Sequence, residues 1–386
     1  MKIKLLLVLI SMSCFGFSQV INYTPSFVCN LSDTTLESSG LIYINKTVWT
    51  HNDSGGKPEL YQIDTLTGFV KRTVKIKNTA NIDWEDLAQS PTHVFIGNFG
   101  NNYGNRTNLT IYRVSKIDLL NPANDSIVAD TIKYHYPDQT VFTSTLNATN
   151  YDCEAFVFMN DSLHLFSKSW VTQNTKHYLL PATIGNHTAL LADSFNVDGL
   201  ITSVDINQTN GNIVLLGYKK VGFNYNCFAW LLFNYTNRNF FKADKRRLEL
   251  GVASTLGQTE GIVLKNDNTG YFSSEKIVFG SGFIPQQLYK FDFSGYYNTT
   301  SINENSNRND YKIYPNPIKE TVTIDFKNVH EPYSFEIINT NGERVYKCQL
   351  NGENHQDINL QTLKSGLYFL RIQGTTNIIS QKIIIE

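Results

Sequence analysis

The sequence predicts an all-β protein: a β-propeller of five blades followed by a small immunoglobulin-like β-sandwich. Three observations support this prediction. Aromatic residues make up 13% of the chain, with 24 Phe and 21 Tyr, and such side chains favour strands. Asn and Gly interrupt the short apolar runs, as they do in turns between strands. Units of strand, turn, strand, turn and strand recur roughly every 45–70 residues, which is the rhythm that antiparallel blades require.

The first eighteen residues are typical of a Sec-type signal peptide. Lys2 and Lys4 flank the start of an apolar run, Leu5–Ile10, that is too short to span a bilayer. Gly16-Phe17-Ser18 offers a cleavage site, and lipidation of Cys14 is the alternative. No other segment approaches about 18 uninterrupted apolar residues, so no transmembrane helix is expected.

Residues 19–297 are expected to form the propeller. Five repeat units begin near Glu37, Asp83, Asp152, Gly199 and Gln258. The segment Ser26–Leu31 precedes the first unit and could supply the outer strand of the last one. Such a ring, closed by the two ends of the domain, would leave no exposed sheet edge there. A six-bladed ring and a pair of β-sandwiches are the alternatives.

A carboxylate recurs at the start of four units: Glu37, Glu85, Glu154 and Glu260. Since the first strand of each blade lines the central channel of a propeller, these side chains are expected to converge. Like charges in a small volume need compensation. A bound cation, hydrogen bonds to backbone amides, or Arg and Lys from neighbouring strands could supply it, with Arg106, Arg113 and Arg246 as candidates. A substrate or catalytic site is a further interpretation of the same carboxylates. Ca²⁺ accepts roughly 6–8 oxygen ligands, so calcium is the expected cation. The candidate metal ligands are Asp83, Glu85 and Asp86.

Two loops rich in Asn and Gly follow the second strands of the first two units. Equivalent loops open on the same face of a propeller, and Asn and Asp provide oxygen ligands. Tight turns are the alternative explanation for the same residues. The candidate binding residues of this loop face are His51, Asn52, Asp53, Asn98, Asn101 and Asn102.

Charge and motifs exclude several classes of function. The formal net charge is −1, from 33 Lys and Arg against 34 Asp and Glu, so the basic surface of a nucleic-acid binder is not expected. The chain has no GxSxG, HExxH, P-loop or GxGxxG motif. A binding protein for an unknown extracellular ligand is therefore predicted. The alternative is a secreted hydrolase, phytase-like, esterase-like or acting on glycans, with a carboxylate-lined and calcium-dependent site.

Four cysteines follow the predicted cleavage site: Cys29, Cys153, Cys227 and Cys348. They are widely spaced and form no CxxC pair, so a zinc site is not expected. Export would permit disulfides, and a Cys29–Cys227 bond is the alternative to four buried thiols.

The last part of the chain is expected to form a separate module. The polar stretch at 298–310 predicts a linker. In the following residues, 311–386, Thr321–Phe326 alternates between apolar and polar side chains, and Asn341-Gly342 predicts a hairpin turn. About seven short strands in this length are typical of a small antiparallel sandwich.

Several motifs of this module resemble the type A C-terminal sorting domain of the Bacteroidetes type IX secretion system. They are Tyr314-Pro315-Asn316-Pro317, the segment Asn341–Val345 with Gly342, the segment Leu363–Ile372 with Gly366, and the terminal Lys382–Glu386. The resemblance implies passage through the periplasm and recognition of the domain by the secretion machinery at the outer membrane. Attachment to the cell surface or release would follow.

The predicted propeller resembles exported bacterial propeller proteins of uncharacterised role. The similar segments are Trp49–Gly55, Asp83–Ala88 and Ile96–Asn102, and some of these proteins distantly resemble esterase-like or phytase-like propellers. Phosphate chemistry would require clustered Lys and Arg, and only Lys245-Arg246-Arg247 approaches such a cluster.

Overall fold

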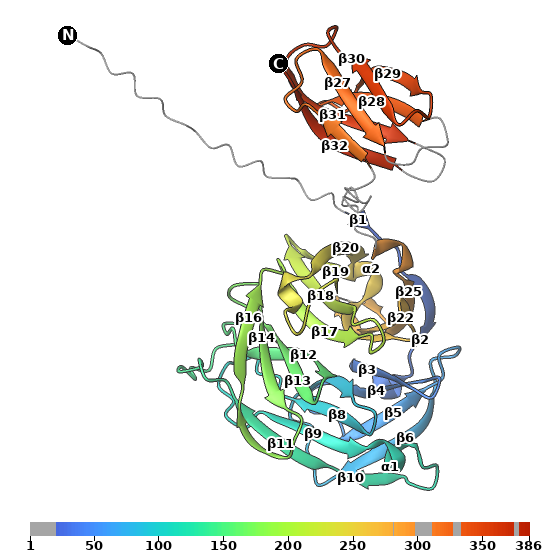
Figure 1. The fold of residues 1–386 in the computed structure, drawn as a ribbon. Coiled ribbons are helices and arrows are strands. Elements are labelled where there is room, and N and C mark those ends of the chain that lie inside the picture. Colours follow the sequence, from blue (N-terminus) through green and yellow to red (C-terminus); the bar gives the residue numbers. More distant parts are fainter. Residues whose placement is uncertain (1–20, 281, 298–310, 327–332, 374–377) are drawn as a thin grey trace, which may run out of the picture. The chain divides into compact units, whose positions relative to one another are not determined.

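The computed structural model describes residues 21–280, 282–297, 311–326, 333–373 and 378–386. The chain divides into two compact units, Met1–Tyr297 and Asn298–Glu386 (Figure 1). The predicted signal peptide (1–18) and linker (298–310) lie outside the described residues. Within the described ranges, no helix has both the length and the apolar character needed to cross a membrane.

The first unit contains five sheets of four or five strands. The first sheet comprises β3 (Ser38–Ile44), β4 (Thr47–Asn52), β5 (Glu59–Ile63), β6 (Val70–Lys77) and β10 (Ser126–Val128). The second comprises β7 (Trp84–Gln89), β8 (His93–Asn98), β9 (Thr110–Ser115), β11 (Asp130–His135) and β15 (Gly185–Thr188). The third comprises β12 (Asp152–Met159), β13 (Ser162–Lys168), β14 (Thr175–Pro181) and β16 (Leu190–Phe195).

The remaining two sheets include strands from the start of the described chain. The fourth sheet comprises β17 (Leu200–Ile206), β18 (Ile213–Val221), β19 (Asn224–Phe233), β20 (Asp244–Val252) and β1 (Ile21–Asn22). The fifth comprises β21 (Gln258–Leu264), β22 (Thr269–Glu275), β25 (Gln287–Asp292) and β2 (Ser26–Asn30). The short elements are η1 (Asp33–Thr35), α1 (Lys116–Leu120), η2 (Phe240–Lys242), α2 (Ala253–Leu256), η3 (Ser294–Tyr296) and the hairpin of β23 (Ile277–Phe279) and β24 (Gly282–Ile284).

Neighbouring sheets are tied together at their outer edges. β10 lies between β9 and β11 in sequence, yet it pairs in parallel with β6 of the first sheet. In the same way, β15 pairs in parallel with β11 of the second sheet. β2 pairs antiparallel with β25, which confirms the expectation that the segment before the first unit completes the last sheet.

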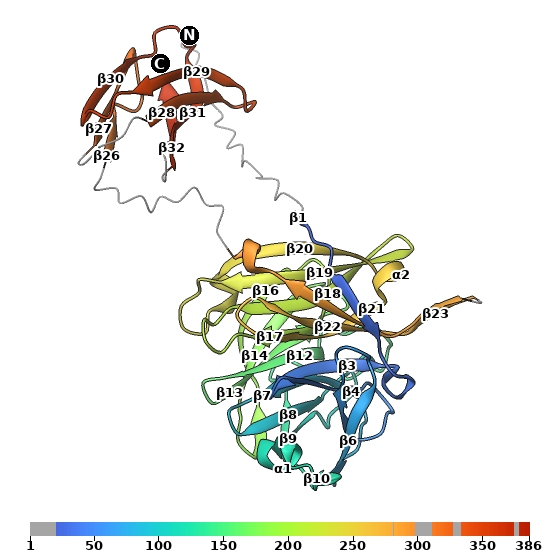
Figure 2. The ribbon, with the colours of Figure 1, turned by 90° about the vertical axis from the view of Figure 1, so that its right-hand side faces the viewer.

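The first strands of the five sheets surround a common centre (Figures 1 and 2). β3 contacts β7, β7 contacts β12, β12 contacts β17, β17 contacts β21, and β21 contacts β3. A separate apolar core fills the space between each pair of neighbouring sheets. Between the first and second sheets, for example, Trp49 and Trp84 are fully buried. The abundance of aromatic residues therefore serves the packing between sheets.

In every sheet of the first unit, the start of the first strand pairs irregularly with the end of the second strand. The register between the two strands shifts in all five sheets. Such a bulge leaves residues of the first strand without a partner in the ladder and changes the direction of their side chains. These shifts decide which residues face the centre of the unit.

The second unit packs two sheets around one core. The three-stranded sheet contains β26 (Tyr311–Tyr314), β27 (Thr321–Phe326) and β30 (His355–Asn359). The four-stranded sheet contains β28 (Tyr333–Asn339), β29 (Arg344–Leu350), β31 (Gly366–Gln373) and β32 (Ile378–Ile385). Ile324 of the first sheet and Phe335 and Leu370 of the second belong to the shared core. Gly342 adopts a φ of 84° in the predicted hairpin turn, a conformation that favours glycine.

The four described cysteines have free thiols, and three of them, Cys29, Cys153 and Cys227, are buried. The alternative disulfide between Cys29 and Cys227 is not formed. These residues fill the cores as small apolar side chains.

Candidate functional site

Three of the predicted glutamates come together at the centre of the first unit. Glu85, Glu154 and Glu260 each lie within the register shift of their own first strand. They are buried, with exposed fractions of 3%, 4% and 5%. The first strands of the other two sheets carry Ser39 and Thr202 at their register shifts. Three of the five sheets therefore contribute a glutamate to the centre.

Glu37 does not join this group. It lies in the turn before β3 and is exposed. In the sequence it resembles the other glutamates because small and apolar residues follow it. Residue 39, two positions later, occupies the register shift in the first sheet. The hydroxyl of Ser39 donates a hydrogen bond to the backbone carbonyl of Glu85, so this position joins the first two sheets.

The three glutamates line a cavity of about 360 Å³, which we call the axial pocket. Its polar lining also includes Asp53, Lys168, Asn102, Asn147 and Gln258. Its apolar and aromatic lining consists of Leu146, Trp170, Tyr218 and Tyr225. The pocket thus combines carboxylates, amides and aromatic rings.

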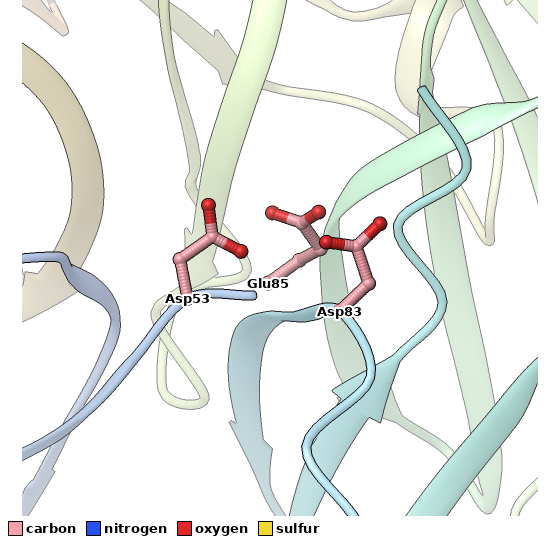
Figure 3. Close-up of side chains that lie close together, drawn as sticks. All are labelled: Asp53, Asp83 and Glu85. Atoms are coloured by element: carbon pink, nitrogen blue, oxygen red, sulfur yellow. The ribbon is translucent and has the colours of Figure 1, made fainter. Parts of the chain in front are cut away.

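Asp53, Asp83 and Glu85 form the first of two carboxylate groups (Figure 3). One oxygen of each lies within 4.8 Å of an oxygen of the other two. Asp53 follows β4, Asp83 immediately precedes β7, and Glu85 belongs to β7, so two neighbouring sheets supply the group. Burial, and then the nearby carboxylates, raise the pKa of Glu85 well above its ordinary value. Burial and Asp152 raise the pKa of Asp83 to about 6.

Arg106 partly compensates this first group. Its Nη1 lies 4.0 Å from Oδ2 of Asp83. The guanidinium is held by two backbone carbonyls, donating at 2.6 Å to Gly100 and at 3.0 Å to Asn98. Because Arg106 reaches only Asp83, the carboxylates of Asp53 and Glu85 have no ion-pair partner among the described residues.

Glu85, Asp152 and Glu154 form the second carboxylate group, again within 4.8 Å of one another. Asp152 accepts hydrogen bonds from the Asn101 amide at 2.6 Å and from Nε1 of Trp170 at 2.8 Å. Glu154 forms a buried ion pair with Lys168. Burial lowers the pKa of Lys168, but Glu154 and the other carboxylates outweigh burial, so its pKa is raised. The second group therefore has a close, buried cation, whereas the first has only the 4.0 Å contact of Arg106 with Asp83.

Most of the predicted loop-face residues support the backbone. Oδ1 of Asn52 accepts from the amide of Glu37 at 3.3 Å, and Oδ1 of Asn98 accepts from the amide of Asp83 at 3.0 Å. The backbone amide of Asn101 donates a hydrogen bond to the carboxylate of Asp152. His51 is fully buried and packs edge-on against Trp84. Asp53 and Asn102 are the loop residues that line the axial pocket.

Asp86 serves the packing between sheets and lies in neither carboxylate group. It is fully buried. Its carboxylate accepts hydrogen bonds from the amides of Leu87, Phe156 and Val204 and from the hydroxyl of Ser203. These partners belong to the second, third and fourth sheets. The expectation that Asp86 is a metal ligand does not fit this arrangement.

Lys168, Trp170, Tyr218 and Tyr225 are pocket residues that sequence reasoning did not assign to a site. Lys168 pairs in the ladder with Asp152, as Asn98 pairs with Trp84 and Tyr218 with Leu200. Of these second-strand residues, Lys168 of the third sheet and Tyr218 of the fourth line the pocket. The signal in the sequence was the recurrence of a polar or aromatic residue at this place.

Comparison with known proteins identifies the C-terminal module. Residues 312–386 match the family described as the secretion system C-terminal sorting domain. This match contains the predicted sorting motifs Tyr314-Pro315-Asn316-Pro317, Gly342 and Gly366. The protein is accordingly a cargo of type IX secretion, recognised by that machinery and exported to the cell surface or the extracellular space. No curated protein matches the chain.

Solved structures resemble the chain only remotely. An exo-β-1,3-galactanase from Phanerochaete chrysosporium is 13% identical with a TM-score of 0.43, and the alignment covers 93% of this chain and 99% of the other. A β-fructofuranosidase from Bombyx mori is 11% identical with a TM-score of 0.40, covering 95% and 89% of the two chains. At such values neither similarity is evidence for an activity.

Proposed function

We propose that the protein is an exported five-bladed β-propeller that binds an extracellular ligand in the axial pocket with the help of a divalent cation. In this proposal residues 1–18 are a signal peptide, 19–297 the propeller, 298–310 a linker and 311–386 an immunoglobulin-like sorting domain. The cyclic contacts of the five first strands support the blade number. The two sheets around one core support the sandwich.

The observation that carries the proposal is the group of Asp53, Asp83 and Glu85. Three carboxylates within 4.8 Å of one another repel each other unless a positive charge or protons compensate them. Arg106 contacts only one of the three. A cation between them would remove the repulsion and fix the loop that carries Asp53 to the second sheet.

The ligand atoms favour Ca²⁺ among divalent cations. All three candidate ligands are carboxylates, and oxygen ligands in a flexible geometry suit calcium. Oδ1 of Asn102, which also lines the axial pocket, is buried and has no hydrogen-bond partner among the described residues. Neither cysteine nor histidine takes part in the carboxylate groups of the described chain, which argues against zinc.

A hydrolase is the second candidate function, and the carboxylates of the second group favour it. Glu85 and Glu154 are close together but differ in their surroundings, because Lys168 neutralises only Glu154. Two neighbouring carboxyl groups in different surroundings are the arrangement from which a general acid and a base arise in glycoside hydrolysis. Binding remains our first proposal because the sequence has none of the nucleophile motifs sought above.

Calorimetric titration of the exported chain with CaCl₂, after treatment with EDTA, tests the cation site. We expect uptake of one ion and a rise in melting temperature that EDTA reverses. Glu85→Gln should abolish both effects, whereas Glu37→Gln, a matched change outside the carboxylate groups, should preserve them. A protein that binds no divalent cation and melts identically in EDTA and CaCl₂ would refute the proposal. Loss of a measurable glycosidase activity in Glu154→Gln would instead favour the hydrolase.

A further inference from the structure

We propose that the ligand of the axial pocket is a neutral, hydroxyl-rich glycan. The inference rests on the proposed binding function and names the chemical class that the pocket would accept. Three features of the pocket carry it: its excess of negative charge, the use of its aromatic walls by a protein ammonium group, and the mixture of amides and rings at its opening.

The charge around the pocket opposes anionic ligands. Seven carboxylates influence one another there: Asp53, Asp83, Glu85, Asp152, Glu154, Glu260 and Glu275. Lys168 and Arg106 are the cations beside them. Burial and mutual repulsion raise the pKa values of these carboxyl groups, and protonation of some of them lowers the negative charge without adding a positive charge that could hold an anion. Phosphorylated, sulfated or uronic-acid ligands would meet repulsion in this field.

Two of the three aromatic rings that line the pocket, Trp170 and Tyr218, already contact a protein cation. The ammonium of Lys168 lies 4.9 Å from the ring centre of Trp170 and 5.2 Å from that of Tyr218. It is only 3% exposed and is fixed by Glu154. A ligand ammonium at these rings would be repelled by Lys168. The protein therefore already contains the cation that an acidic aromatic pocket would otherwise recruit.

A sugar matches the groups that remain. Carboxylates and the unpartnered Oδ1 of Asn102 accept hydrogen bonds from hydroxyl groups. The amides of Asn147 and Gln258 can both donate and accept. Tyr225 is 40% exposed and stands edge-on to Tyr218 at 5.5 Å, so its ring can cover the apolar face of a sugar at the opening.

Exposed apolar side chains also occur at a lining residue of the pocket and next to one. Leu146, which lines the pocket, is 56% exposed, and Val171, next to Trp170, is 62% exposed. Small apolar surfaces beside hydrogen-bonding groups suit a ligand whose faces alternate between C–H and O–H groups.

The test is a glycan array probed with the full exported chain in CaCl₂. The array should carry neutral oligosaccharides beside sulfated and uronic-acid counterparts, and lysine-rich peptides and phytate should be assayed separately. We expect binding to neutral members. Tyr225→Ala should weaken it about tenfold, which corresponds to about 1.4 kcal/mol, whereas Tyr225→Phe should retain it. Leu66→Ala, a change at an 85% exposed residue away from the pocket, is the control.

The outcomes separate the two proposals. Uptake of Ca²⁺ without binding of any neutral glycan overturns the glycan inference and leaves the cation site intact. Glycan binding that is equal in EDTA and CaCl₂ refutes the proposal that a cation assists ligand binding, while it supports a glycan as the ligand. Binding confined to acidic glycans, phytate or lysine-rich peptides overturns the inference, because it contradicts the charge argument.

Discussion

The backbone of Gly100 lies directly against the carboxylate of Glu85. A β-carbon added at Gly100 would lie 1.9 Å from Oε1 of Glu85 and 2.4 Å from Oδ2 of Asp83. Arg106 fixes this backbone by donating to the Gly100 carbonyl at 2.6 Å. The absence of a side chain at residue 100 therefore sets the position of two of the three candidate cation ligands.

Gly100→Ala should abolish cation binding although it removes no carboxylate. The new methyl group would displace Glu85 and Asp83, and the three oxygens could not keep their mutual distances. Calorimetry with CaCl₂ should show at least a tenfold loss of affinity, about 1.4 kcal/mol or more. Gly295→Ala is the matched control, because a β-carbon at that position meets nothing within 4 Å. Normal affinity in Gly100→Ala would show that the cation binds elsewhere.

Lys168→Met should destabilise the protein strongly, because it leaves the buried carboxylate of Glu154 without its partner. Breaking one side of a buried ion pair costs about 3–5 kcal/mol. The double variant Lys168→Met/Glu154→Gln should recover part of this loss, since no unpaired charge remains. Urea denaturation at neutral pH measures both changes. If the single variant is as stable as the unmodified protein, Glu154 is protonated or another cation compensates it.

The strand pattern was readable from the sequence because it depends on local alternation. First strands begin at or next to the expected unit starts, as β12 (Asp152–Met159) does at Asp152 and β21 (Gln258–Leu264) does at Gln258. The sorting module was equally readable, because its turns and motifs are local. Closure by β2 could be anticipated because the last unit lacked an outer strand.

The details of the site depend on register, which local sequence does not specify. Glu37 and Glu85 look equivalent in the sequence, but the register shift selects Ser39 in the first sheet. The ion pair of Lys168 with Glu154 joins two strands through a bulge. Asp86 likewise has partners that are 70 or more residues away in sequence. Such relationships appear only when neighbouring sheets are placed together.

Stabilisation by Ca²⁺ should increase between about pH 5 and pH 7.5. Burial raises the pKa of Asp83 to about 6, so protons and the cation compete for this carboxylate below neutral pH. A raised native pKa also means that the cation-free protein loses stability as pH rises through 6, and Ca²⁺ should remove this loss. The difference in melting temperature with and without CaCl₂ at each pH measures the effect. A constant difference would contradict the assignment of Asp83 as a ligand.

Replacing Asp86 should affect stability without affecting cation binding. Asp86→Ala removes the acceptor for three buried amides and one hydroxyl, and each unsatisfied group costs about 1–3 kcal/mol. We expect at least about 3 kcal/mol lower stability in urea denaturation, compared with little change in the exposed control Asp118→Ala. Asp86→Asn should still bind one Ca²⁺. Loss of Ca²⁺ binding in a folded Asp86→Asn protein would show that Asp86 is a metal ligand after all.

Acid should destabilise the protein through a buried histidine pair between the third and fourth sheets. Nδ1 of His164 lies 2.9 Å from Nε2 of His177, and His177 stacks on Phe166 with the ring centres 5.3 Å apart. Burial lowers the pKa of His164 to about 4 and that of His177 to about 3. Both rings therefore stay neutral in the native state, while the unfolded chain gains protons below about pH 6.5. Stability falls as pH drops, by about 2 kcal/mol for each histidine at pH 5.

The double variant His164→Phe/His177→Phe should show a smaller loss of stability between pH 6.5 and pH 5 than the unmodified protein. Comparing the two proteins cancels the opposite contribution of Asp83, which both contain. His135→Gln, at an exposed residue of β11, should leave the pH profile unchanged. Urea denaturation at several pH values measures the slopes. An unchanged slope in the double variant would mean that the two histidines take up protons in the native protein as readily as in the unfolded chain.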